Sequence, residues 1–238
     1  KNEARTHPEH GGTLLMTLDD LEDADWENNW KQYYKPMEIG DRLLVVPEWL
    51  REDPKVRAGL TAGRVALVLD PGLTFGTGSH ATTRLCLTAL EKTIRGGERV
   101  LDLGCGSGIL SIAALKLGAA SAAAVDIDDK CRDVAYENAA LNGIGQDTYT
   151  VRIGDVLGDA VLRADLGGGW QMVVANIVAD VIIGLSPLVR PMLAPGGLFL
   201  CSGIIDDRAQ EVADRLRENG WEILETRSAE GWFSYLCR

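Results

Sequence analysis

Short apolar segments alternate with segments of helical periodicity from residue 99 to the end of the chain, and this alternation restricts the possible folds. The apolar segments are expected to be strands, at Arg99–Leu103, Ala122–Asp126, Tyr149–Ile153, Met172–Ala175 and Leu198–Ser202. The helices expected between and after them are Gly108–Leu117, Lys130–Asn142, Val178–Met192 and Asp206–Asn219. Strands that alternate with helices in this way form a parallel sheet with helices on both faces. The segment MVVA is apolar throughout, as expected for a strand that is buried on both faces.

Further elements flank this alternating region. Two strands are expected at Arg42–Val46 and Val65–Leu69, and a helix at Thr82–Arg95. After the last helix, Trp221–Arg227 and Trp232–Cys237 are expected to pair as antiparallel strands. The sequence therefore predicts an α/β fold with a mostly parallel seven-stranded sheet, helices on both faces and an antiparallel C-terminal strand.

The first 40 residues differ in composition from the rest. Residues 1–25 are polar and carry nearly half of the formal net charge of −11, so they are expected to form an arm or linker, with one short strand at Thr13–Leu18. Residues 26–36 contain four aromatic side chains, three of them at helical spacing, and Pro36 ends the run. We therefore divide the chain into an acidic arm with a short aromatic helix at 1–40 and a catalytic domain at 41–238.

Charge and composition argue against several classes of function. The chain has 35 acidic and 24 basic residues, whereas binding to nucleic-acid phosphates needs clustered lysine and arginine. The excess of acidic residues suits a basic partner, because electrostatic attraction between opposite charges speeds association. The same excess equally serves to keep the protein soluble. No apolar run reaches the ~18 residues of a membrane helix and no signal peptide is recognisable. The odd number and wide spacing of the cysteines suit reduced thiols in a cytosolic protein, so a cytoplasmic enzyme is expected. The five cysteines lie far apart and only three histidines are present, so no metal site is predicted.

The segment VLDLGCGSG at residues 100–108 joins a strand to a helix through three alternating glycines. Glycine permits a tight turn and lets a ligand approach the backbone without meeting a Cβ atom. The helix that follows presents free N–H groups at its first turn. Gly104 and Gly106 are therefore predicted to contact a cofactor.

Polar residues follow the next three strands of the alternating region. Asp126 comes 22 positions after Gly104, where an acid is expected to hold ribose hydroxyls. Asp155 either accepts a hydrogen bond from an adenine amino group or caps a turn. Asn176 either orients a substrate amine with its amide or occupies a turn. The carboxyl edge of an open α/β sheet, where these residues are expected, is the edge at which ligands bind.

The glycine spacing distinguishes between two cofactors. A dinucleotide site requires G-x-G-x-x-G, whereas this chain has G-x-G-x-G, with Ile109 where the last glycine would fall. S-adenosyl-L-methionine contains adenine and ribose but no pyrophosphate, so it needs fewer hydrogen bonds from the N–H groups of the helix N-terminus. The terminal strand pair also favours the methyltransferase variant of the Rossmann-like fold, so a class I methyltransferase is expected. An NAD-dependent oxidoreductase and a non-catalytic binding domain of the same fold are the less favoured alternatives.

A second glycine-containing segment, FGTGSHATT at residues 75–83, precedes the helix expected at Thr82–Arg95. Phe75 is expected to cover a bound cofactor. Thr82 or Thr83 either caps the helix or touches the ligand. His80 is either a site residue or a loop histidine that makes a local hydrogen bond.

Taken together, these segments resemble the ribosomal protein L11 methyltransferase family. The resemblance spans about residues 25–205, and its most specific part is FGTGSHATT together with NIVAD at 176–180. It implies S-adenosylmethionine contacts at Thr83, Gly104, Asp126 and Asn176, and a loop at Asn176 that faces the amine to be methylated. Members of the family also carry an N-terminal substrate-recognition domain, of which residues 1–25 resemble only the tail.

The reaction that the resemblance implies is N-methylation of lysine ε-amines, and in some members the α-amine, of ribosomal protein L11, a basic protein. Another protein lysine or a small amine is the alternative substrate. The segment NIVA lacks the N-P-P-Y pattern typical of glutamine and adenine-amine methyltransferases, which argues against those two substrates. No general base stands out, so Asn176 is expected to orient the nitrogen while water takes the proton.

Overall fold

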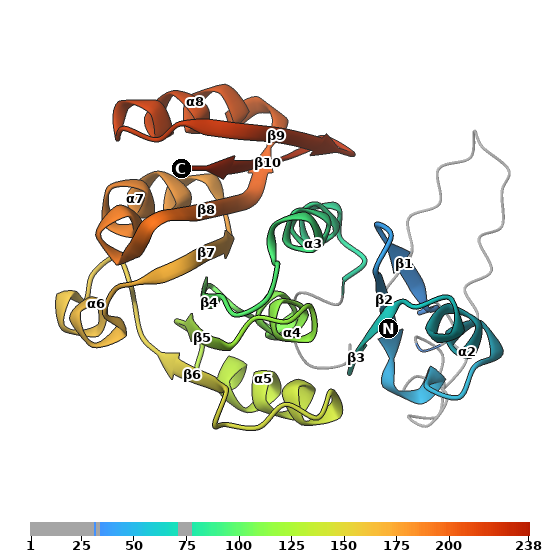
Figure 1. Ribbon diagram of the computed structural model, residues 1–238. Helices are drawn as coiled ribbons and strands as arrows, with labels where there is room; N and C mark the ends of the chain where they lie inside the picture. The colour runs from blue at the N-terminus through green and yellow to red at the C-terminus, as the bar shows by residue number, and fades with distance from the viewer. Residues whose placement is uncertain (1–30, 32–33, 71–77) are drawn as a thin grey trace, which may run out of the picture. The chain divides into compact units, whose positions relative to one another are not determined.

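The structure is a computed structural model that describes residue 31 and residues 34–70 and 78–238 (Figure 1). Residues 35–238 form one compact unit, and residues 1–34 are assigned to another. The strand expected at Thr13–Leu18, most of the aromatic helix expected at 26–36, and Phe75 lie outside the described residues. Within the described ranges, no helix is both long enough and apolar enough to cross a membrane.

The centre of the larger unit is a seven-stranded sheet in the order β6-β5-β4-β7-β8-β10-β9. Its strands are β4 (Arg99–Leu103), β5 (Ser121–Asp126), β6 (Tyr149–Ile153), β7 (Trp170–Asn176), β8 (Leu193–Ile205), β9 (Ile223–Ala229) and β10 (Trp232–Cys237). The first five in the spatial order are parallel, and β10 runs antiparallel to both of its neighbours, β8 and β9. The prediction of a mostly parallel seven-stranded sheet with an antiparallel C-terminal strand is confirmed.

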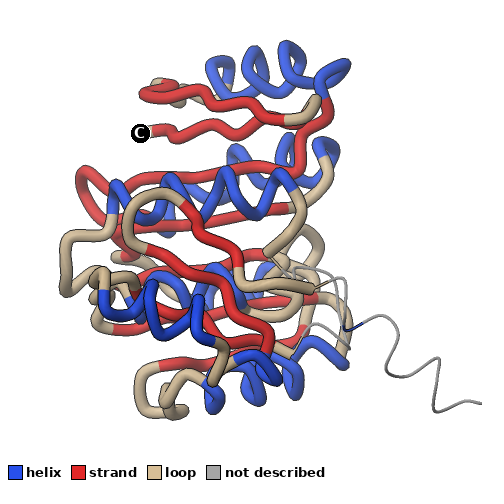
Figure 2. Tube along the Cα trace, turned by 90° about the vertical axis from the view of Figure 1, so that its right-hand side faces the viewer, coloured by secondary structure: helices blue, strands red, loops and turns tan. Residues whose placement is uncertain are grey.

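Helices cover both faces of this sheet (Figures 1 and 2). One layer consists of α3 (Ala81–Thr93), α4 (Ile109–Lys116) and α5 (Lys130–Leu141). The other layer contains α7 (Ala179–Val189) and α8 (Asp206–Glu218). The short helix α6 (Ala160–Leu166) connects β6 to β7, and the 3-10 turn η3 (Arg190–Met192) leads into β8.

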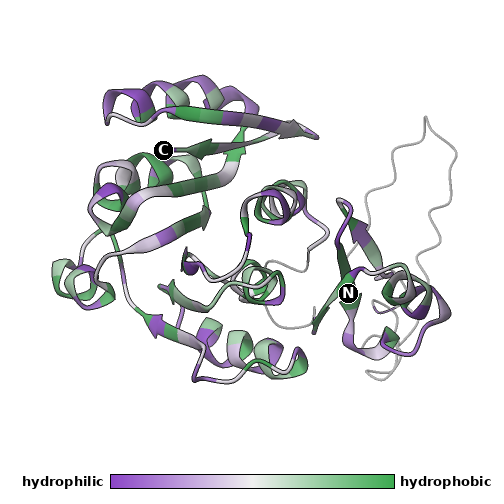
Figure 3. Cartoon of the chain, viewed as in Figure 1, coloured by the Kyte–Doolittle hydropathy of each residue, from purple (hydrophilic) through white to green (hydrophobic). Residues whose placement is uncertain are grey.

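Successive strand residues supply the two hydrophobic cores alternately, because side chains of a strand point to opposite faces in turn. Val100 of β4 joins the core that contains Ile112 of α4, and Leu101 joins the core that contains Ile182 of α7. All four side chains are completely buried. This explains why most positions of the central strands are apolar, whereas α8 is largely hydrophilic on its outer side (Figure 3).

The two early strands belong to a separate three-stranded sheet. It consists of β1 (Met37–Ile39), β2 (Leu43–Pro47) and β3 (Val65–Leu69), with β1 antiparallel and β3 parallel to β2. The 3-10 turn η2 (Glu48–Leu50) and helix α2 (Pro54–Thr61) connect β2 to β3. One face of β2 packs with Val56 of α2, and the other joins the core beneath α3, α4 and α5.

Three elements were not predicted, namely β1, α2 and α6. Strand β1 has three residues, which is too short for a recognisable period of hydrophobicity. Helix α2 does carry a local start signal, because Asp53 accepts a hydrogen bond from the Lys55 N–H (2.7 Å) and Pro54 follows it.

Strand β8 approaches the segment after β7 most closely at Gly203. This residue has a φ of +87°, and a Cβ atom added to it would lie 2.3 Å from the carbonyl oxygen of Ile177. The Ile177 N–H in turn donates to the Ser202 carbonyl at 3.0 Å. Both the backbone conformation and the close approach therefore require glycine at this position.

We expect the substitution Gly203→Ala to lower the free energy of unfolding by at least about 3 kcal/mol, because the methyl group must displace backbone atoms in a packed region. Gly231→Ala is the matched control, since Gly231 also has a positive φ (+78°) but no atom within 4 Å of its added Cβ. This control is expected to cost about 1 kcal/mol, from the backbone conformation alone. Urea unfolding of both variants measures the difference, and equal losses would contradict the steric explanation.

Candidate functional site

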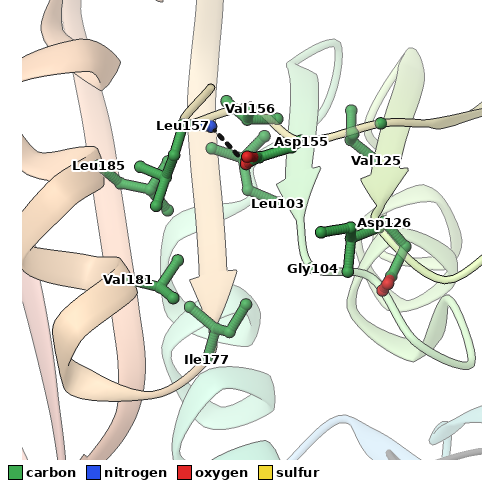
Figure 4. Close-up of a pocket in the computed structure, with 12 residues that line it drawn as sticks. Leu103, Gly104, Val125, Asp126, Asp155, Val156, Leu157, Ile177, Val181 and Leu185 are labelled. Atoms are coloured by element: carbon green, nitrogen blue, oxygen red, sulfur yellow. Dashed lines mark hydrogen bonds between the residues drawn. The ribbon is translucent and has the colours of Figure 1, made fainter. Parts of the chain in front are cut away.

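A cavity of about 280 Å³ lies at the carboxyl edge of the main sheet (Figure 4). The ends of β4, β5 and β7, the loop after β6 and the inner side of α7 enclose it. Its lining residues are Leu103, Gly104, Val125, Asp126, Ile127, Gly154, Asp155, Val156, Leu157, Ile177, Val181 and Leu185. The lining is apolar except for the carboxylates of Asp126 and Asp155. A cavity of this kind suits a flat, largely apolar ring system that carries a few hydrogen-bond donors.

The three glycines after β4 all have positive φ, at +78°, +51° and +78°. Gly108 is the N-cap residue of α4, and an added Cβ would lie 2.8 Å from Tyr149 Oη and 3.1 Å from Ala135 Cβ. The third glycine of the motif therefore lets α4 pack closely against β6 and α5. Gly104 lines the cavity, where an added Cβ would lie 3.0 Å from Ile177 Cδ1.

The carboxylate of Asp126 is held in place by backbone N–H groups. Its Oδ2 atom accepts from the Gly106 N–H at 2.8 Å, and its Oδ1 atom accepts from the Asp128 N–H at 3.0 Å. An ionised carboxylate has about four lone-pair sites, so two hydrogen bonds leave capacity for two further donors. The structure thus connects two of the predicted residues, Gly106 and Asp126, directly.

Asp155 lines the same cavity from the loop after β6. Its Oδ1 atom accepts from the Leu157 N–H at 2.9 Å, which closes a local turn (dashed line in Figure 4). The turn interpretation of Asp155 is thus observed, and the side chain nevertheless remains part of the cavity wall. Asp128, two residues after Asp126, accepts from the Lys130 N–H at 3.0 Å, but the N-cap residue of α5 is Asp129, whose side chain makes no capping hydrogen bond.

Asn176 and Thr83 meet beside the cavity rather than in its lining. The Asn176 Nδ2 atom donates to Thr83 Oγ1 at 3.4 Å, and the Thr83 side chain is completely buried. Among the described residues, the Oδ1 atom of Asn176 is buried and has no hydrogen-bond partner. Ile177, the next residue, lines the cavity. A buried acceptor without a partner is costly, and its position beside the cavity marks it as a group that a ligand donor would satisfy.

His80 makes local contacts. It is the N-cap residue of α3, and its Nδ1 atom lies 2.8 Å from Thr82 Oγ1 and accepts from the Thr82 N–H at 3.4 Å. Its ring also packs edge-on against Trp232 of β10, with 4.9 Å between the ring centroids. Nearby, Arg84 of α3 forms an ion pair with Glu230 in the turn between β9 and β10 at 2.5 Å. The start of α3, which carries Thr83, is therefore tied to the C-terminal hairpin.

Asp102 is a buried acid that the sequence did not single out. It lies in β4, is 1% exposed, and its Oδ2 atom accepts from the N–H (3.2 Å) and the hydroxyl (2.8 Å) of Ser111 in α4. Burial raises the pKa of Asp102 from the usual 3.8 to about 6, although the hydrogen bonds from Ser111 lower it in part. The negative charge of Asp126 raises it further.

Sequence reasoning also missed the apolar cavity walls. Three of them directly follow a polar residue at the end of a strand, namely Ile127, Val156 and Ile177. An apolar residue directly after each predicted polar residue was the available signal. Leu185 and Val181 come from α7, and only the packing of that helix brings them to the cavity.

The comparison with protein families decides between the cofactor classes. The family model for ribosomal protein L11 methyltransferase matches residues 2–238. The chain belongs to this family. One curated relative is the ribosomal protein L11 methyltransferase of Caldanaerobacter subterraneus subsp. tengcongensis, which is 41% identical over 95% of this chain and 69% of its own length. The chain spans about two thirds of the length of the curated relatives that it matches.

Solved structures agree with the assignment to the L11 methyltransferase family. The ribosomal protein L11 methylase from Lactobacillus delbrueckii subsp. bulgaricus has a TM-score of 0.76 and 34% sequence identity, over 86% of this chain and 98% of that one. Fibrillarin from Aeropyrum pernix, solved with natively bound S-adenosyl-L-methionine, has a TM-score of 0.54 at 16% identity, over 65% of this chain and 74% of that one. The second likeness shows the class I methyltransferase fold alone.

The observed site fits S-adenosylmethionine. The apolar cavity walls suit the adenine ring, and the carboxylate of Asp126 retains capacity to accept ribose hydroxyls. Asn176 carries the buried, unpartnered Oδ1 atom, and the next residue, Ile177, lies against Gly104, where an added Cβ atom would be 3.0 Å from Ile177 Cδ1. These are observations on the chain itself, and they agree with the glycine spacing that disfavours a dinucleotide.

The raised pKa of Asp102 predicts a pH dependence of stability. The folded protein keeps a proton on Asp102 over a range in which the unfolded chain has lost it, so this group makes the protein less stable as the pH rises from about 4 to about 6. The expected loss is about 3 kcal/mol across that range. Asp102→Asn cannot ionise and is expected to lack this loss.

Denaturant unfolding of wild type and Asp102→Asn at several values of pH measures the effect, because other titrating groups cancel in the difference. Parallel pH curves for the two proteins would show that Asp102 is ionised in the folded state like an ordinary carboxylate.

Proposed function

We propose that this chain transfers methyl groups from S-adenosyl-L-methionine to lysine ε-amines, and in addition to the α-amine, of ribosomal protein L11. Membership of the L11 methyltransferase family supports the reaction and the substrate. The observation on the structure that carries the proposal is the position of the buried, unpartnered Asn176 Oδ1 atom beside a cavity that holds Asp126. It combines a cofactor-sized space with an acceptor for an N–H group.

In this proposal the cavity holds the adenosyl part of the cofactor. Asp126 accepts the ribose hydroxyls while the Gly106 and Asp128 N–H groups keep its carboxylate oriented. Asp155 accepts from the adenine amino group, and Gly104 and Gly106 allow the remainder of the cofactor to approach the backbone. Thr83 and Asn176 border the region where the methyl group is presented.

The bound cofactor supplies an electrophilic methyl group on a sulfonium centre. Asn176 orients the attacking amine, because its Nδ2 atom is engaged by Thr83 and its Oδ1 atom is left to accept an N–H from the substrate. The nitrogen must be neutral to use its lone pair, and the apolar surroundings favour loss of the proton from a lysine by disfavouring its charge. Correct alignment of two reactants supplies on the order of 7–11 kcal/mol in well-oriented systems.

The charge at this edge suits a basic protein substrate. Carboxylates that follow the strands or begin the helices add negative charge at this edge of the sheet. Asp180 pairs with Arg208 and Glu230 pairs with Arg84, and the other carboxylates are those of Asp128, Asp129, Asp206 and Asp207. A field of one sign accelerates encounter with a partner of opposite charge. Because ribosomal proteins are made in the cytoplasm, the proposal also places the enzyme there.

A binding and transfer experiment tests this function. Calorimetric titration is expected to show saturable binding of S-adenosylmethionine but not of NAD, and labelled cofactor is expected to transfer its methyl group to purified L11. Asp126→Ala should weaken cofactor binding at least tenfold, because charge-assisted hydrogen bonds to the ribose are lost. Asp133→Ala is the control of equal charge, since Asp133 is 79% exposed and does not line the cavity.

Each result of that experiment has a distinct meaning. Binding of NAD alone would contradict the cofactor assignment. Binding of S-adenosylmethionine with transfer only to another protein or to a small amine would contradict the L11 assignment and retain the methyltransferase. Unchanged cofactor affinity in Asp126→Ala would show that Asp126 does not hold the ribose hydroxyls.

We expect Asn176→Ala to lower kcat far more than cofactor affinity, by roughly 100-fold, because a misaligned amine loses most of the benefit of positioning. Steady-state kinetics with L11 and calorimetry with the cofactor measure the two effects separately. Thr83→Ser, which keeps the hydroxyl that engages Asn176, is the control and should retain most of the activity. Equal losses of turnover and cofactor affinity in Asn176→Ala would mean that Asn176 acts mainly as a cofactor contact.

A further inference from the structure

Asn138 of α5 connects two loops that are distant in the sequence. Its side chain is 1% exposed. The Oδ1 atom accepts from the N–H of Asp70, the residue after β3, at 3.0 Å. The Nδ2 atom donates to the carbonyl oxygen of Ser107, inside the glycine motif, at 3.0 Å. One buried amide thus bridges the end of the small sheet and the loop that the proposed function assigns to the cofactor.

The two partners fix the orientation of this amide. A backbone N–H can only donate and a carbonyl oxygen can only accept, so Oδ1 must face Asp70 and Nδ2 must face Ser107. A shorter side chain at this position removes the hydrogen bond of Asn138 to the Asp70 N–H and its hydrogen bond to the Ser107 carbonyl oxygen. Replacement of Asn138 therefore affects both loops at once.

The glycine motif is held from two sides by this arrangement. The Gly106 N–H donates to Asp126 Oδ2 at 2.8 Å, and the carbonyl oxygen of the next residue, Ser107, accepts from Asn138 at 3.0 Å. These two bonds attach adjacent residues of the loop to β5 and to α5. The position of the loop relative to the carboxylate of Asp126 therefore depends on Asn138 as well.

Asn142, one helical turn later, provides a natural comparison. Its Oδ1 atom accepts from the Val68 N–H at 2.9 Å, and its Nδ2 atom donates to the Val68 carbonyl at 2.7 Å. Strand β3 is an edge of the small sheet, so this amide satisfies the backbone of an otherwise unpaired edge. Asn142 binds β3 two residues before the Asp70 amide that Asn138 binds, and among the described residues it has no hydrogen bond to the glycine motif.

We propose that Asn138 is a positioning residue that couples the end of β3 to the glycine motif and thereby sets the affinity for the cofactor. Asn142 anchors β3 without this coupling. The identity of the cofactor rests on the proposed function, whereas the coupling of the two loops rests only on the hydrogen bonds of Asn138.

Hydrogen exchange of the protein without cofactor tests the coupling directly. In Asn138→Ala, the amides of Asp70, Gly106 and Gly108 are expected to exchange roughly tenfold faster. This factor corresponds to the loss of one hydrogen bond at each loop. In Asn142→Ala, faster exchange is expected at Val68 but not at Gly106 or Gly108. Equally faster exchange of the glycine-motif amides in both variants would overturn the proposal, because general loosening of α5 would then explain the faster exchange.

Cofactor affinity gives the second readout. Calorimetry with S-adenosylmethionine is expected to show roughly tenfold weaker binding by Asn138→Ala and wild-type binding by Asn142→Ala. Equal affinity of both variants and wild type would overturn the proposed effect on affinity. Failure of the wild-type protein to bind the cofactor would instead contradict the proposed function, and the exchange result would still decide the coupling.

Asn138→Asp keeps the test decisive if Asn138→Ala folds poorly. In its ionised form the carboxylate still accepts from the Asp70 N–H but cannot donate to the Ser107 carbonyl, so this variant is compared with wild type at alkaline pH. We expect slow exchange at Asp70, as in wild type, together with faster exchange at Gly106 and Gly108 and weaker cofactor binding. Unchanged exchange at the glycine motif in this variant would show that the bond to Ser107 does not position the loop.

Discussion

Five parallel strands, β6, β5, β4, β7 and β8, lie side by side in the main sheet, and their backbone hydrogen bonds hold all of their carboxyl ends at one edge. The strand interiors are mostly apolar because helices cover both faces, with Asp102 of β4 as an exception, and the other polar side chains of the site come where the strands end. Asp126 and Asn176 are the last residues of β5 and β7, and Asp155 follows β6. The cavity, its carboxylates and the buried amide beside it are all consequences of this pairing.

Close approach of backbone segments gives the carboxyl edge of the main sheet its detailed shape. Gly108 lets α4 lie against Tyr149 and Ala135, and Gly203 lets β8 lie against the backbone of Ile177. Ile177 in turn contacts the position of Gly104 and lines the cavity. Glycine is therefore needed at these positions for packing between protein segments as much as for contact with a ligand.

Side-chain hydrogen bonds to the backbone hold the loops that carry the site. Asp126 holds the central Gly106 of the glycine motif, and Asn138 holds the next residue, Ser107. Asp102 attaches its strand to α4 through Ser111. The small sheet is part of the same arrangement, because Asn138 of α5 and its C-cap residue Asn142 bind the backbone of Asp70, just after β3, and of Val68 in β3. The cofactor loop is thus supported from a segment more than 30 residues earlier in the chain.

The sequence by itself determined the alternating strands and helices, the fold class, and the polar residues at the strand ends. Each of these follows from the local periodicity of hydrophobic residues or from the spacing of residues along the chain. Gly104, Gly106, Asp126 and Asp155 were identified in this way, and the structure places them at or beside one cavity. Tertiary structure alone decided that the two early strands form a sheet of their own, that α7 contributes cavity walls, and that Asp102 and Asn138 are buried. The physical reason is that burial and hydrogen bonding between residues such as Asp70, Ser107 and Asn138 depend on the packing of α5 against two distant loops, which no local pattern of hydrophobicity records.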